Sequence, residues 1–291
     1  MKHKKPIALL LTLVMLIAAL ASCTGGGETP SSTPTPTETA DASGDADAGD
    51  TNTEEPANAA VEAIRSAGVL KVGCKEDVPN FGILDITTKE YTGLEIDIAG
   101  LLATEIFGDP SKVRFQGVTA ATRGPLLDNS DIDMVIATFT ITEERKLTYN
   151  FSDPYYQDAV GMLVRLDSGI TSIADCDGKV IGVAQSATSR DAIQAAADAA
   201  GVSVTFNEYG TYPEIQMALL SGNVDVFCVD RSILRGYLTS ELTLTDDKFS
   251  PQEYGVATKF ENKELAEYVN TLIQKWNADG TIQGLIDKYG I

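Results

Sequence analysis

The sequence KVIGVAQSATSRDAIQAAADAAGVSVTFNEYGTYPEIQMALLSGNVDVFCVD, residues 179–230, alternates strand-like and helix-like patterns at short intervals. Three runs rich in apolar and β-branched residues predict strands over Lys179–Ala184, Val202–Phe206 and Val224–Val229. The segments between them are each long enough for one helix. Strand, helix and strand at this spacing favour a parallel sheet with helices on both faces.

Both connecting segments carry signals for where their helix begins or ends. The first helix is expected from about Ser189 to Ala200 and stops at Gly201, because glycine readily adopts the left-handed conformation that ends a helix. The second begins at a capping box, in which Thr211 and Glu214 can each bond the other's backbone, with a proline inside the first turn. We expect this helix to continue to Leu220.

The same alternation extends toward the N-terminus, with strands expected at Val69–Val72, Val113–Phe115 and Met134–Phe139. A helix over Leu94–Ile106 carries an apolar stripe, and Glu264–Asn277 has the periodicity of a terminal helix. The chain therefore has room for two α/β units. In open sheets of this class, ligands bind beyond the carboxyl ends of the strands, near helix N-termini.

The N-terminus has the pattern of an export signal. Lysines at positions 2, 4 and 5 precede the apolar run Ile7–Ala21, whose fifteen residues suit a signal-peptide core but are short for a permanent membrane span. The run ends in Leu20-Ala21-Ser22-Cys23, which resembles the lipobox of bacterial lipoproteins. We expect residues 1–23 to be this signal, with Cys23 the lipidated first residue of the mature chain. The alternative is an ordinary signal peptide with a chance cysteine.

Residues 24–59 form a tract rich in Ser, Thr, Pro and acids, with almost no large apolar side chain. Such a tract cannot bury enough surface to offset its conformational entropy, so we expect a disordered tether. A folded body held by this tether to an acyl anchor is suited to visiting a membrane partner. The chain is thus predicted to be extracytoplasmic and attached to the cell membrane by its lipid alone.

The formal charge of −20 limits the possible partners. Removing the three signal lysines and the eight acids of the tether leaves the folded body near −15, so nucleic acid is not an expected partner. The only histidine, His3, lies in the signal, which removes the commonest general base and metal ligand from the mature chain. Cys74, Cys176 and Cys228 have the spacing of neither a zinc site nor a disulfide framework and are expected to be buried thiols. We expect no metal and no cofactor.

Several segments carry motifs that are weak singly but occur in a characteristic order. They are Gly93–Ile98, then Ile136–Arg145 with Asn150–Tyr156, then Gly182–Thr188, Val224–Asp230 and Tyr254–Ala257. From about Val61 to Ile291 the chain resembles the extracellular solute-binding proteins of family 3, which serve amino-acid ABC importers. More narrowly, Val78–Phe81, Thr122–Asp128 and Ala137–Thr140 resemble the branch that binds aspartate and glutamate.

The resemblance implies a two-lobed α/β fold of the periplasmic-binding-protein type II class, in which two lobes joined by two crossing strands close over the ligand. Lobe 1 would comprise residues 60–154 and 256–291, and lobe 2 residues 160–251. The crossings would be hinges at residues 155–159 and 252–255. A ligand shifts such an open–closed equilibrium only by its differential affinity for the closed form.

The resemblance also assigns roles in binding the α-amino and α-carboxyl groups of an amino acid. Arg145 would clamp the α-carboxylate, which suits a guanidinium because it can donate two parallel hydrogen bonds. Thr138 and Thr140 would bind beside it, and Thr188, at a helix start, would reach it from lobe 2. Asp230 would hold the ammonium. The alternatives are a surface arginine at a helix start and an aspartate that caps a helix.

Lys75, Arg123 and, as a third candidate, Tyr212 are expected to contact the ligand's side chain. Two cations facing a neutral side chain would repel each other in a desolvated site, and a ligand carboxylate would relieve that repulsion. An acidic amino acid, aspartate or glutamate, is therefore the favoured ligand. Glutamine is next, since its amide oxygen can accept from both cations. The alternative for Lys75 and Arg123 is a pair of solvated surface charges.

We therefore expect a monomeric binding subunit that captures a free amino acid and delivers it to an ABC permease, whose ATPase subunits drive import. It is not expected to be an enzyme. One alternative is a cyclohexadienyl-dehydratase-like enzyme of the same fold, in which Asp230 with a raised pKa would take the place of the absent histidine. A ligand-sensing module is another, although such chains normally carry an added catalytic or signalling domain.

Overall fold

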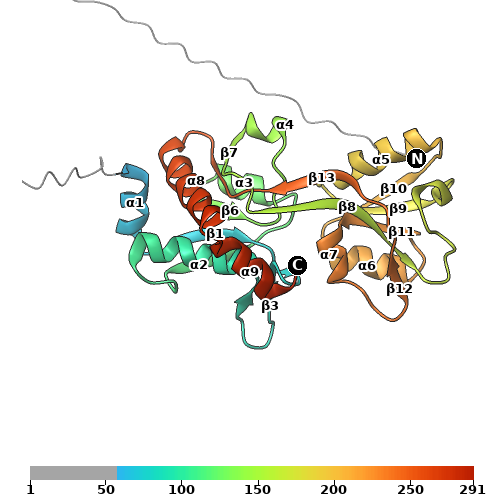
Figure 1. Cartoon of the computed structure of the whole chain (residues 1–291), viewed down its shortest axis with the longest axis horizontal. Helices are drawn as coiled ribbons and strands as arrows, with labels where there is room; N and C mark the ends of the chain where they lie inside the picture. Colours follow the sequence, from blue (N-terminus) through green and yellow to red (C-terminus); the bar gives the residue numbers. More distant parts are fainter. Residues whose placement is uncertain (1–57) are drawn as a thin grey trace, which may run out of the picture. The chain divides into compact units, whose positions relative to one another are not determined.

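The computed structural model describes residues 58–291, which form two mixed sheets and a small third sheet, with helices packed on them (Figure 1). The predicted signal peptide, the lipidation site Cys23 and all but the last two residues of the tether lie outside the described residues, so these assignments stay predictions. Within residues 58–291, no helix is both long and apolar enough to cross a membrane.

The first sheet gathers strands from both ends of the described chain. Its order is β5 (Val113–Gly117), β1 (Leu70–Cys74), β6 (Met134–Ile136), β14 (Ala257–Lys259) and β7 (Tyr149–Phe151). β1 is parallel to β5 and β6, whereas β14 is antiparallel to β6 and β7. The C-terminal part of the chain thus completes a sheet that begins near residue 70.

The second sheet is also mixed. Three of its strands, from the region with which the sequence analysis began, are parallel, and β8 is antiparallel to all its partners. The expectation of parallel pairing is therefore confirmed for the strand–helix–strand units but was wrong for the complete sheets, because β8 and β14 enter from outside these units and can pair antiparallel without a crossover helix. The strands are β10 (Thr205–Tyr209), β9 (Val180–Ala184), β11 (Val226–Asp230), β8 (Tyr156–Arg165), β12 (Leu242–Leu244) and β13 (Phe249–Tyr254).

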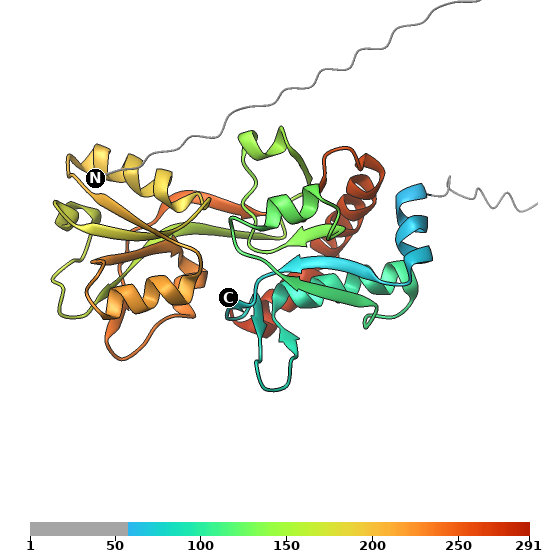
Figure 2. The ribbon, with the colours of Figure 1, turned by 180° about the vertical axis from the view of Figure 1, so that it is seen from behind.

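β8 and β13 run between the two sheets and pair with each other, Tyr156–Ala159 opposite Pro251–Tyr254. Both views of the ribbon show the yellow-green β8 and the orange β13 side by side along this path (Figures 1 and 2). The segments predicted as hinges, residues 155–159 and 252–255, fall in or next to this pair. Their role in motion, like the lobe boundaries, stays a prediction.

Three of the predicted helices form as expected. They are α2 (Leu94–Phe107), α5 (Ser189–Ala200), which ends at a left-handed glycine, and α6 (Tyr212–Leu220). At the start of α6 the Glu214 carboxylate accepts a hydrogen bond from the Thr211 N–H at 3.0 Å, as in a capping box. The other helices are α1 (Ala59–Ala67), α3 (Arg123–Asp128), α4 (Glu143–Lys146), η1 (Ile173–Cys176), α7 (Arg231–Arg235), α8 (Lys263–Ala278) and α9 (Thr281–Tyr289).

Three details of the predicted elements were wrong. The strand expected over residues 134–139 ends three residues early, because Thr138 has a φ of 43° and leaves the extended conformation. The strand expected over residues 202–206 is shifted by three residues, since β10 pairs with β9 only from Thr205 onward. The helix predicted as terminal is α8, but α9 follows it after a left-handed turn at Gly280.

A third sheet was not anticipated. It consists of β2 (Asp77–Val78), β3 (Gly82–Leu84) and β4 (Tyr91–Thr92). Strands of two or three residues are too short to show the alternation that marks a strand in sequence. The sheet follows β1 directly and places Asp77 two residues beyond Lys75, which matters for the site.

The core confirms two expectations about individual side chains. The predicted apolar stripe of α2 is fully buried. The thiols of Cys74, Cys176 and Cys228 are buried and free, as expected for structural cysteines.

Candidate functional site

The carboxyl ends of strands from both sheets supply most of the predicted site. Lys75 follows β1, Thr138 and Thr140 follow β6, and Asp230 ends β11. Six of the eight predicted side chains belong to residues no more than 5% exposed: Lys75, Arg123, Thr138, Thr140, Tyr212 and Asp230. Lys75 and Arg123 are therefore not solvated surface charges, and that alternative is ruled out.

Lys75 and Tyr212 come together around a third residue, Asp77. The Lys75 Nζ lies 4.5 Å from the centre of the Tyr212 ring and 3.2 Å from the Asp77 carboxylate. The Tyr212 N–H also points to that carboxylate, at 3.4 Å. Burial lowers the pKa of Lys75, and the field of Asp77 acts in the opposite direction. Lys75 thus has an anionic partner that the sequence analysis did not anticipate.

Arg123 is a buried cation held by neutral groups. Its guanidinium carbon lies 3.8 Å from the centre of the Phe139 ring, and its Nη1 donates to the carbonyl oxygens of Ala137 and Thr138 at 2.8 and 3.2 Å. Burial, followed by the charge of Arg145, lowers the pKa of Arg123 to about 9. Among residues 58–291, no carboxylate pairs with it. The guanidinium can therefore accept an anion as a partner.

Arg145 joins the loop after β6 to the loop before α5. Its Nη1 donates to the Thr140 carbonyl oxygen at 2.8 Å, and its Nη2 donates to the Ser186 carbonyl oxygen at 3.2 Å. It lies at the start of the short helix α4, where Thr142 caps the Arg145 N–H. Burial lowers the pKa of Arg145, while Asp230 raises it. Like Arg123, it has no carboxylate ion pair within the described part of the chain.

Asp230 is placed by the pairing of β11 with β8 and then begins α7. Its carboxylate makes no capping bond to that helix and instead accepts a hydrogen bond from the Tyr254 hydroxyl. Burial raises the pKa of Asp230 to about 7, against the lowering effect of the tyrosine bond and of two arginines. The helix-cap interpretation therefore does not describe this side chain.

Thr140 and Thr188 meet at Gln252, a buried residue of β13 that the sequence analysis did not single out as a binding residue. The Gln252 Oε1 accepts from both threonine hydroxyls, each at 2.7 Å. Thr188 precedes α5 but, like Asp230, makes no side-chain cap. The glutamine thus connects the loop after β6 to the loop before α5. No local pattern in the sequence distinguishes it from other strand residues.

Glu95 is a further residue of the site, which the sequence analysis did not identify as a site residue. Its side chain is fully buried on the apolar face of α2, and one carboxylate oxygen accepts from the Thr138 N–H and the Tyr155 hydroxyl. Burial raises its pKa to about 7, although the two bonds and the charges of Lys75 and Arg123 lower it. The sequence did contain a signal for this role, because Glu95 is an acidic residue between the buried positions of the family motif Gly93–Ile98.

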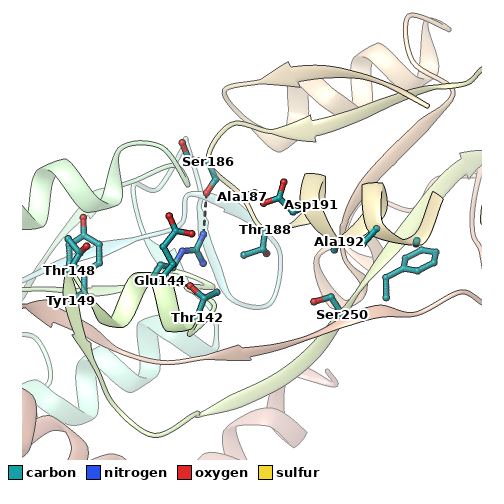
Figure 3. A pocket seen from close by; sticks show the side chains of 14 residues that line it. Thr142, Glu144, Thr148, Tyr149, Ser186, Ala187, Thr188, Asp191, Ala192 and Ser250 are labelled. Atoms are coloured by element: carbon teal, nitrogen blue, oxygen red, sulfur yellow. Dashed lines mark hydrogen bonds between the residues drawn. The ribbon is translucent and has the colours of Figure 1, made fainter. Parts of the chain in front are cut away.

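A cavity of about 930 Å³ opens beside Arg145. Figure 3 shows Ser186 and Thr188 on one side of it and Thr142 and Glu144 on the other, and its dashed line is the bond from Arg145 to Ser186. Among the predicted site residues only Arg145 and Thr188 line this cavity; the others are buried more deeply. The cavity is therefore the outer part of the site. Among residues 58–291, no group of His, Cys, Asp or Glu side chains is placed to hold a metal ion.

The family can now be identified from the whole described body. The sequence profile of the bacterial extracellular solute-binding proteins, family 3, matches residues 70–291. The chain belongs to this family. The resemblance inferred from the motifs is therefore confirmed, as is the two-lobed type of fold.

Relatives in this family have different ligands in their names. The chain is 35% identical over 264 residues to the glutamine-binding protein of Geobacillus stearothermophilus, covering 90% of this chain and 94% of that protein. It is 28% identical over 252 residues to the glutamate-binding protein GluB of Corynebacterium glutamicum, covering 82% of each. The structure of a cysteine-binding protein from Campylobacter jejuni matches with a TM-score of 0.72 and 27% identity, over 79% of this chain and 92% of that one.

Proposed function

We propose that this chain is the binding subunit of an ABC importer that captures an acidic amino acid, aspartate or glutamate, with glutamine as the second candidate. The observation that carries this proposal is the pair of guanidiniums of the buried Arg123 and the half-buried Arg145, which lack a carboxylate partner within the described residues. A buried cation is stabilised by an anion that also satisfies its hydrogen-bond donors. A ligand with two carboxylates provides one for each arginine.

The α-groups of the ligand would bind at the end of the site that contains Arg145, next to the cavity. Arg145 would pair with the α-carboxylate, with the Thr140 and Thr188 hydroxyls beside it. Asp230, already held by Tyr254, would bind the ammonium. Binding would then draw on residues from both sheets, which is what a two-lobe closure mechanism requires.

The side chain of the ligand would lie deeper, by Lys75 and Arg123, and the charges of the whole site decide its nature. With Glu95 protonated, Lys75, Arg123 and Arg145 bring three positive charges, and Asp77 and Asp230 bring two negative ones. In that state a neutral zwitterion leaves one positive charge over, whereas aspartate or glutamate cancels it. Glutamine remains the rival because its amide could accept from Lys75 and donate to Asp77, which pair with each other at 3.2 Å.

We also propose that the chain transports rather than catalyses, and acts as a monomer anchored by lipidated Cys23. Its relatives with known roles are named as binding proteins. In a dehydratase-like enzyme, Asp230 would have to transfer a proton; in a binding protein its carboxylate, which accepts from Tyr254 and interacts with Arg145, would pair with the ammonium of the ligand. The captured amino acid would pass to a membrane permease and its ATPase subunits.

Calorimetric titration of the mature protein without its predicted lipidated cysteine, residues 24–291, with aspartate, glutamate, glutamine, cysteine and histidine tests this function. We expect one-to-one binding of aspartate or glutamate, with glutamine at least about tenfold weaker. Arg145→Ala should weaken binding by about 30- to several-thousand-fold, because it leaves a desolvated ligand carboxylate without a partner. The matched control is Arg190→Ala, which removes an exposed arginine paired with Glu208.

Each outcome has a separate meaning. Tighter binding of glutamine would keep the transport function and reject the acidic ligand. Unchanged affinity in Arg145→Ala would reject the site. Absence of binding to every one of these amino acids would favour the enzyme or sensor alternatives.

A further inference from the structure

We propose that Glu95 is a specificity-determining residue whose proton sets whether the site prefers an acidic side chain or its amide. In the protonated form of Glu95 the site has room for one more negative charge; in the ionised form it does not. Binding of glutamate or aspartate would thus be accompanied by uptake of a proton at Glu95. This inference rests on the proposed function of binding an acidic amino acid.

The position of Glu95 makes it a fixed part of the site. It is fully buried, and its Oε1 accepts from the Tyr155 hydroxyl at 2.6 Å and from the Thr138 N–H. Its Oε2 is buried and has no hydrogen-bond partner within the described residues. A carboxylate leaves that second oxygen desolvated, whereas a carboxylic acid places its proton there. Either form can keep both bonds to Oε1.

The surroundings of Glu95 contain both positive and titratable groups. Lys75, at the end of β1, and Arg123, in α3, both stabilise its negative charge. Cys74, Tyr155 and Tyr212 also interact with that charge, and burial raises the pKa of each of them, so they stay neutral at physiological pH. Glu95 is therefore the group facing the two side-chain cations whose charge can change near neutrality.

The charges of Lys75 and Arg123 connect Glu95 to the ligand. In the absence of a ligand carboxylate, these cations favour the ionised form of Glu95. When an acidic side chain binds to the same cations, it repels the Glu95 carboxylate and raises the pKa of Glu95 further. Affinity for an acidic ligand is therefore greatest when Glu95 is already protonated and falls as pH rises above about 7. A neutral amide does not meet this penalty.

Asp230 also titrates near neutrality, with a raised pKa of about 7. It would be ionised on binding the ammonium of any amino acid, which releases a proton and has the opposite dependence on pH. Since glutamate and glutamine share this ammonium, the contribution of Asp230 cancels when the two ligands are compared. The difference in pH dependence between glutamate and glutamine therefore reports on Glu95 alone.

The test is calorimetry of the mature protein at pH 7.5 in buffers of different ionisation enthalpy, which counts the protons exchanged on binding. In the wild-type protein, glutamate should take up roughly half a proton more than glutamine. Glu95→Gln can still accept from Tyr155 and Thr138 but cannot titrate, so this difference should vanish. Glu105→Gln, the same change at an exposed position of the same helix, should leave it intact.

A second measurement applies even if Glu95→Gln does not fold. In the wild-type protein, the affinity ratio of glutamate to glutamine should fall about tenfold between pH 6 and pH 8. If both ligands bind with a constant ratio and equal proton uptake, or if the difference persists in folded Glu95→Gln, the role of Glu95 is rejected while the proposed function stands. If neither ligand binds the wild-type protein, the proposed function fails and this inference with it.

Discussion

The ring of Phe139 packs against two guanidiniums at the site. Arg123 and Arg145 lie 3.8 and 4.8 Å from the centre of its ring, and the charge of Arg145 disfavours the charged form of Arg123 and lowers its pKa. Cation–π contact and carbonyl acceptors offset part of the cost of holding two like charges close together in a largely buried place. In the proposed function, a ligand anion would offset more of this cost.

Asp230 leads to a prediction about pH. The ionised carboxylate is the form that pairs with an ammonium, and burial raises its pKa to about 7. Affinity for glutamine should therefore rise severalfold from pH 6 to pH 8 and level off above that range, because the proton no longer has to be displaced. Asp230→Asn should bind at least about tenfold more weakly at pH 8. Calorimetry across this range measures both effects.

Asp158→Asn is a useful control for that experiment, since Asp158 also interacts with Asp230 but accepts a hydrogen bond from the Ser232 N–H, in the first turn of α7. The affinity of the Asp158→Asn variant for glutamine should still rise with pH. If the affinity of Asp230→Asn rose by the same factor, a group other than Asp230 would be responsible for the pH dependence.

At the scale of the element, the start of α2 determines where Glu95 lies. Gly93 precedes the helix with a φ of 136°, which brings it against the backbone of Phe81. A Cβ at this position would be 2.1 Å from the Phe81 carbonyl oxygen, closer than any side chain can approach. The glycine thus allows the small β2–β3–β4 sheet to pack on the helix, with Glu95 directed into the core.

This geometry predicts different effects for two glycines that both have positive φ. Gly93→Ala should lower the melting temperature by at least about 10 °C, because it adds a collision with backbone to an unfavourable φ. Gly201→Ala, at the end of α5, has open space around the new Cβ and should lower it by only about 2–6 °C. Thermal unfolding followed by circular dichroism measures both. Equal shifts in melting temperature would mean that the positive φ alone, and not the contact with Phe81, explains why position 93 requires glycine.

At the scale of the whole folded body, polar contacts join the two sheets at the site. Gln252 bridges Thr140 and Thr188, and Arg145 reaches the Ser186 carbonyl oxygen. The covalent connection between the sheets is the β8–β13 pair, to which Gln252 belongs. These groups stabilise the arrangement in which, under the proposed function, both sheets would contact the ligand.

Gln252→Ala should weaken ligand binding by about 5- to 30-fold, since it leaves two buried hydroxyls unpaired in the arrangement that binds. The Glu95 bonds and the ion pair of Lys75 are not affected, so the preference among ligands should stay the same. Calorimetry with the favoured ligand checks this. Gln157→Ala, an exposed glutamine on the paired strand β8, is the matched control. Affinity unchanged in Gln252→Ala would show that the bridge does not contribute to binding.

The site could be predicted from sequence only where its residues lie within motifs. Lys75, Arg123 and Asp230 follow strands or open helices in recognisable segments, and the structure buries all three. Asp77 was missed because its importance comes from a small sheet too short to be seen in sequence. Gln252 was missed because its partners are 112 and 64 residues away along the chain.

The α/β class, the family and the helices α2, α5 and α6 could be predicted from the amino-acid sequence, because motifs, periodicity and caps are properties of neighbouring residues. The mixed pairing of both sheets, the ion pair of Lys75 with Asp77 and the burial of Glu95 beside two cations became visible in the folded chain alone. Strand order, burial and ionisation depend on contacts between distant segments. Those contacts form only when the hydrophobic core brings the segments together.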